Sequence, residues 1–168
     1  MAKTVDVQLL NPFIQATTDC LVQMAGCRPS RRRIFIKQDP TMIGDVAGII
    51  GMTQGITGSC VVSFPMVLAQ RIVGKLLMEA PESVNEQMVD DGIGEVANMV
   101  AGGAKRQFSS LGTYKFNIST PTVIRGSNPT KLFNPIDTVS IACEFAADPD
   151  WPETFLIEVA LKPQEKDG

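Results

Sequence analysis

Residues 94–105 read GEVANMVAGGAK, an otherwise apolar segment that carries one glutamate and one asparagine. Hydrophobic residues before, within and after it recur at helical spacing, which predicts a helix with one buried face. These residues are Val89, Ile93, Val96, Ala97, Val100, Ala104 and Phe108. Glu95 and Asn98 are three positions apart on the opposite face, so their Cβ atoms lie about 5–6 Å from each other. The stretch therefore predicts a rigid helix that presents a carboxylate and a carboxamide side by side.

An ordinary explanation competes with a functional site, because glutamate and asparagine are common on solvated helix surfaces. Two features favour a site. Asparagine is a poor mid-helix residue, since its side chain competes for backbone hydrogen bonds. The run Ala101-Gly102-Gly103-Ala104 follows, and each glycine costs about 1 kcal/mol relative to alanine. Such small residues let another surface approach closely, although tight packing inside the fold stays open as the reason for one of the two glycines.

The composition describes one domain with a substantial core, or two small halves that share one. The chain has 168 residues, of which 44% are hydrophobic and 20% are charged, as in ordinary globular proteins. The net charge of −3 provides no broad basic surface for nucleic acid. One basic cluster, RPSRRR at residues 28–33, runs into an apolar segment. We interpret it as the solvated beginning of a strand, with a contact patch for an acidic partner as the alternative.

Histidine is absent from the sequence, which excludes histidine-based general base catalysis, phosphohistidine relays and nearly all histidine-containing metal sites. The four cysteines form no C-x-x-C pair, and three of them lie in apolar runs. This pattern favours reduced core thiols in a cytosolic protein. The first residues lack a hydrophobic signal region and no run approaches a membrane span. We therefore expect a cytoplasmic location and no membrane insertion.

Helix and strand signals alternate along the chain in a regular order. Asn11 as N-cap and Pro12 at the first helical position start a helix that ends near Gly26. The remaining predicted elements follow in order. They are a strand at 32–38, hairpin strands at 45–52 and 58–64 around a loop at 53–57, a helix from Pro65, a polar connection at 80–85 and a helix at about 86–110. Three further strands include residues 114–123, 139–145 and 155–161, and a turn at 148–152 places Trp151 back on the sheet.

A weak internal repeat supports duplication of a helix followed by three strands. Residues 24–26 can be aligned with residues 100–102. In this alignment Asp19 matches Glu95 and Val22 matches Asn98. We therefore predict a single α/β (α+β) domain over residues 1–168. It consists of two related halves, about 1–64 and 86–163, joined by a helix at about 65–78.

Several motifs resemble the CheC/CheX/FliY family of chemotaxis phosphatases, and its CheX branch most closely. They span most of the chain in the family's order, whereas the part from Gly126 onward matches only as a strand pattern. The motifs are NPF at 11–13, GDVAGIIG at 44–51, TGSCVVSFP at 57–65, GEVANMVAG at 94–102 and PTV at 121–123. The resemblance implies duplicated units that form a six-stranded sheet packed by long helices. It also implies a homodimer, because one intact E-x-x-N helix is typical of the CheX branch.

The activity implied by the resemblance is hydrolysis of the aspartyl phosphate on a CheY-like response regulator. Asn98 would orient the attacking water, and Glu95 would pair with the partner's active-site lysine. Asp91, Gly102 and Lys105 are candidates for further contact with the partner. No intrinsic cofactor is implied, because the receiver domain itself holds Mg²⁺. The alternative is a non-catalytic docking module for a receiver domain or a flagellar-switch component, and a third possibility is a structural subunit in which neither residue matters.

Overall fold

The structure is a computed structural model that describes residues 6–39, 41, 44–126 and 139–163. Its strands form one antiparallel sheet in the order β1-β6-β7-β3-β2-β4, and β5 also pairs with β2. The helices are α1 (Asn11–Ala25), α2 (Met66–Leu77) and α3 (Glu86–Ser110), with 3₁₀ turns at Val7–Leu9 and Pro81–Ser83. The strands are β1 (Ser30–Lys37), β2 (Val46–Thr53), β3 (Ile56–Phe64), β4 (Asn117–Ile118), β5 (Thr122–Arg125), β6 (Ser140–Ala146) and β7 (Thr154–Pro163).

The sheet has six strand positions, as the resemblance implied, because β4 and β5 share one edge. Both pair with β2, β4 through Met52 and Thr53 and β5 through residues 46–49. Between them Ser119 bridges the gap, since its backbone N–H donates to the Gly51 carbonyl and its Oγ accepts from the Gly51 N–H, each at 2.9 Å. The prediction of one continuous strand at 114–123 is therefore wrong in two respects. Its first residues lie outside β4, and the strand is interrupted just before Pro121, which has no N–H to donate.

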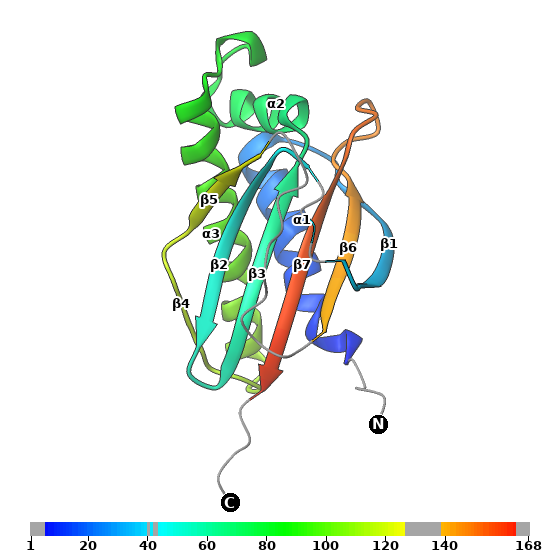
Figure 1. Ribbon diagram of the computed structural model, residues 1–168, viewed down its shortest axis with the longest axis vertical. Helices are drawn as coiled ribbons and strands as arrows, with labels where there is room; N and C mark the ends of the chain where they lie inside the picture. Colours follow the sequence, from blue (N-terminus) through cyan, green and yellow to red (C-terminus); the bar gives the residue numbers. More distant parts are fainter. Residues whose placement is uncertain (1–5, 40, 42–43, 127–138, 164–168) are drawn as a thin grey trace, which may run out of the picture.

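Helices α1 and α3 cover one face of the sheet, and α2 lies across one end (Figure 1). The core between them contains fully buried aromatic side chains. Phe155 stacks on Phe64 and Phe145 with ring centroids 4.9 and 5.2 Å apart. Helix α3 lies unusually close to the sheet, because a Cβ on Gly48 of β2 would be 2.7 Å from the Ala97 Cβ. This packing fixes which face of α3 remains on the surface.

Most predicted elements are present, with small corrections at their ends. Asn11 is the first residue of α1 and not its N-cap, because Leu10 occupies the cap position, while Gly26 ends the helix in the left-handed conformation with φ 59°. The hairpin loop is shorter than predicted and consists of Gln54 and Gly55. Trp151 is half-buried against the core, with the Arg71 guanidinium 5.7 Å from its ring centre. Among the described residues, no helix is long and apolar enough to cross a membrane.

Candidate functional site

Two side chains hold the N-terminal end of helix α3, one that precedes the helix and one from strand β5. The Asn85 side chain accepts a hydrogen bond from the Met88 backbone N–H at 2.9 Å and caps the helix. Arg125 of β5 forms ion pairs with Glu86 at 2.6 Å and with Asp90 at 2.9 Å. These contacts tie the first two turns of α3 to the edge of the sheet. The helix then runs without interruption to Ser110.

Glu95 and Asn98 lie on the surface of this continuous helix. Glu95 is exposed and Asn98 is half-buried, whereas Val96 and Ala97 between them are 1% and 0% exposed. Within the part of the chain that the structure describes, neither polar side chain forms a hydrogen bond or an ion pair. Both side chains therefore keep their full hydrogen-bonding capacity for a molecule that approaches α3.

The two glycines after this pair have different roles, a question that the sequence left open. A Cβ on Gly103 would lie 2.9 Å from the Ala16 Cβ of α1, so Gly103 permits close helix packing. A Cβ on Gly102 would meet only Arg106, with Nη1 at 3.7 Å. Gly102 thus leaves the surface next to Asn98 free of side-chain bulk.

Asp91 and Lys105 lie on the same stripe of α3 as Asn98, because each is seven residues from it. Asp91 is exposed, and its Oδ1 accepts a hydrogen bond from Gln87 at 3.0 Å. Lys105 is half-buried and lines a pocket. The structure therefore places all five residues named from the sequence along one stripe of α3.

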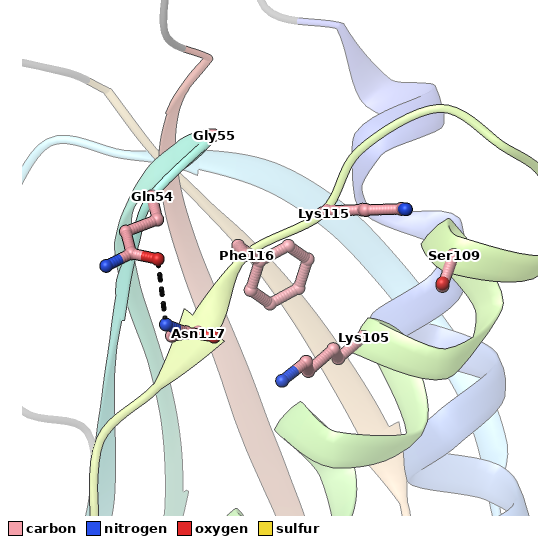
Figure 2. Close-up of a pocket in the computed structure, with 7 residues that line it drawn as sticks. All are labelled: Gln54, Gly55, Lys105, Ser109, Lys115, Phe116 and Asn117. Atoms are coloured by element: carbon pink, nitrogen blue, oxygen red, sulfur yellow. Dashed lines mark hydrogen bonds between the residues drawn. The ribbon is translucent and has the colours of Figure 1, made fainter.

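The pocket beside Lys105 has a volume of about 450 Å³ and lies between α3, the β2–β3 turn and the segment before β4. Figure 2 shows Lys105 and Ser109 on one side and Gln54, Gly55 and residues 115–117 on the other. Asn117 Nδ2 donates a hydrogen bond to Gln54 Oε1 at 2.9 Å. The sequence analysis missed Gln54 and Asn117, since no local motif marks residues that are brought together only by the fold.

The four cysteines are free and buried, and none resembles an activated nucleophile. Burial, with a smaller contribution from the negative charge of Glu95, raises the pKa of the Cys20 thiol to about 12. Burial likewise raises the pKa of Cys60 to about 12 and that of Cys143 to about 11. Across the described ranges, no three histidine, cysteine or acidic residues are grouped so that they could hold a metal ion. Glu95 and Asn98 supply one carboxylate and one neutral amide on the surface of α3.

The fold and the site together define an α+β protein that offers a carboxylate–carboxamide pair on the surface of a helix packed against an antiparallel sheet. A model of the family described as "Chemotaxis phosphatase CheX" matches residues 46–145. The chain belongs to this family.

Individual relatives agree with this assignment. The chain is 25% identical over 121 residues to the CheY-P phosphatase CheX of Thermotoga maritima, a match that covers 72% of this chain and 77% of that protein. A CheC-like superfamily protein from Shewanella sp. PV-4 shares its structure with a TM-score of 0.82 and 34% identity, over 94% of this chain and 99% of the other. The fold also matches the CheX–CheY–BeF3–Mg²⁺ complex from Borrelia burgdorferi, with a TM-score of 0.77, 21% identity and coverage of 94% and 99%.

Proposed function

We propose that this protein hydrolyses the aspartyl phosphate of a CheY-like response regulator and that Glu95 and Asn98 act on the partner. The observation that supports this most is the Glu95–Asn98 pair on the surface of α3. Its side chains have no partner among the described residues of a chain from the CheX family. The Thermotoga maritima relative, a CheY-P phosphatase, provides the substrate class.

Asn98 enters the partner's active site in this proposal and holds a water molecule in line with the phosphorus atom. Its carbonyl oxygen accepts a hydrogen bond from the water, and its neutral amide does not repel the phosphoryl group as a carboxylate would. The water oxygen attacks phosphorus, the P–O bond to the aspartate breaks, and the partner's aspartate leaves as a carboxylate. The protons of the water leave with the inorganic phosphate. Phosphoryl transfer depends mainly on positioning and charge neutralisation, so the chain needs no nucleophile of its own.

Glu95 serves in docking by forming an ion pair with the lysine in the receiver's active site. Glu95→Ala is therefore expected to raise KM about tenfold and to leave kcat nearly unchanged, since the pair holds substrate and transition state equally. Steady-state kinetics with a phosphorylated receiver measure both constants. Glu82→Ala, which removes an exposed glutamate from the 3₁₀ turn Pro81–Ser83, is the matched control. A fall in kcat with KM unchanged would contradict the docking role.

The remaining parts of the proposal concern the cofactor, the location, the oligomeric state and the internal repeat. The receiver holds the Mg²⁺ that the reaction uses, and this protein contributes no cofactor. We place the reaction in the cytoplasm and the protein in a homodimer. The structure offers β1 at one edge of the described sheet and β4 with β5 at the other, and unpaired strand edges favour association. The two related halves joined by α2 likewise stay a prediction.

The test of the function is phosphate release from a panel of phosphorylated CheY-like receiver domains, with and without this protein. We expect catalytic amounts of the protein to accelerate the loss of phosphate from at least one receiver well above its spontaneous rate. Binding to a phosphorylated receiver without any acceleration, even at saturating protein, would contradict the proposal and favour the non-catalytic docking module.

A further inference from the structure

We propose that the pocket beside Lys105 binds a carboxylate side chain on the surface of the receiver domain and thereby fixes the orientation in which the receiver docks on α3. This inference rests on the proposed function. It adds a second anchoring point, away from the residues that act on the phosphoryl group.

The pocket lies within reach of a receiver that docks on Asn98. Lys105 follows Asn98 by two helical turns on the same face, about 10 Å along the helix axis. A domain of about 100 residues has a radius of gyration of about 13 Å. A receiver that seats its phosphorylated site on Asn98 therefore also extends over Lys105. Gly102, which lies between them and is open to approach, provides no side chain to hold the partner away.

Charges of opposite sign lie on the two sides of Asn98. Asp91 and Glu95 precede it along the exposed surface of α3, whereas Lys105 and Arg106 follow it. A partner that presents its lysine to Glu95 and a carboxylate to Lys105 matches this arrangement in only one direction along the helix. Reversed docking would place like charges together, which is strongly unfavourable at an interface. The charge pattern therefore selects an acidic group as the occupant of the pocket.

Lys105 is available for such a group. Its ammonium forms no ion pair with any residue that the structure describes, although the side chain is half-buried. In Figure 2 it reaches toward β4 below the ring of Phe116, whereas Lys115 points away to the other side. A charged side chain that is partly buried in a pocket is screened less by salt than one on an open surface. A carboxylate that enters the pocket therefore gains more than an ordinary surface pair.

The rim of the pocket opposite Lys105 is fixed before any partner arrives. Gln54 and Gly55 form the two-residue β2–β3 turn with φ of 64° and 97°, a left-handed pair typical of tight hairpins. A Cβ on Gly55 would lie 2.1 Å from the Lys115 carbonyl oxygen, so only glycine allows the turn to pack there. The hydrogen bond between Gln54 and Asn117 closes the rim. Such preorganisation reduces the entropy lost on binding.

The experiment measures the Kd of this protein for a receiver domain loaded with beryllofluoride, a phosphoryl analogue, at low and at high salt. Lys105→Gln is expected to raise Kd about fivefold at low salt, and Lys105→Glu about twentyfold, because the second change introduces repulsion. Both effects shrink at high salt. Lys75→Gln, at an exposed lysine on α2, is expected to leave Kd unchanged. The thermal unfolding temperature of each variant reports on folding.

The outcomes separate this inference from the function on which it rests. An unchanged Kd for Lys105→Gln, with receiver dephosphorylation by the unaltered protein intact, overturns the pocket alone. A loss of affinity equal at low and high salt assigns Lys105 a packing role and also overturns it. A protein that neither binds nor dephosphorylates any receiver of the panel overturns both proposals.

Discussion

Replacing Asn98 by alanine is expected to slow receiver dephosphorylation about a hundredfold in kcat, which corresponds to about 2.7 kcal/mol of activation free energy. The amide is the group that we propose to orient the water, and alanine can neither accept nor donate a hydrogen bond in its place. The fold should not suffer. The Asn98 side chain is half-buried and forms no hydrogen bond within the described residues, and alanine is the better helix former.

Two further variants make this prediction specific. Asn98→Asp keeps the shape of the side chain but adds a negative charge, so we expect it not to restore turnover. Asn11→Ala makes the same change at an exposed position at the start of α1 and should leave kcat unaltered. Single-turnover measurements of phosphate release, with KM determined separately, provide the values. If Asn98→Ala turns over its substrate at the normal rate, Asn98 does not orient the water.

Helix α3 shows how much of the site could be predicted from the sequence. Its observed bounds, Glu86–Ser110, agree with the prediction. The signals that set them are local in the sequence: a long helical repeat of apolar residues and the polar connection that precedes it. The same repeat correctly predicted that Val96 and Ala97 are buried and that Glu95 lies on the surface. Local signals were sufficient to place Glu95 and Asn98 on the surface of this helix.

Other features depend on contacts between distant segments, which one sequence does not contain. The roles of Gly102 and Gly103 differ because Ala16 of α1 packs against Gly103, a contact between segments far apart in the sequence. The Lys105 pocket combines α3 with a turn some 50 residues earlier in the chain. The interruption between β4 and β5 depends on Ser119, which replaces part of the strand pairing to Gly51. Alternating hydrophobicity alone gave no sign of this break.

A pair of buried charges at the end of β1 could not be predicted from the sequence pattern. The Lys37 Nζ at the end of β1 lies 2.9 Å from Glu158 Oε1 of β7, with side-chain exposures of 5% and 10%. Strand alternation puts both residues on the sheet face opposite α1 and α3, since Ile141 and Cys143 of the intervening β6 belong to the core beneath those helices. A buried ion pair is sensitive to the loss of either member.

Lys37→Met is expected to reduce the free energy of unfolding by about 3–5 kcal/mol near neutral pH, because it leaves the Glu158 carboxylate buried without its counter-charge. The effect depends on pH. Burial already raises the pKa of Glu158 above its ordinary value of 4.5, and Lys37 partly opposes that rise. Without Lys37 the folded-state pKa is higher still. The folded state then favours the protonated acid, so the loss of stability shrinks as pH falls through that pKa.

Urea unfolding at about pH 7.5 and at about pH 5 measures this difference in sign and size. Arg33→Met on the same strand is the matched control. Its ion pair with Glu144, at 3.3 Å, has side-chain exposures of 62% and 23%, and its loss should cost less than about 1 kcal/mol. The double variant Lys37→Met/Glu158→Leu removes both charges and should regain most of the stability, since an apolar pair of similar volume avoids the desolvation cost. A double variant as unstable as Lys37→Met would show that the loss arises from packing of the lysine chain and not from the unpaired carboxylate.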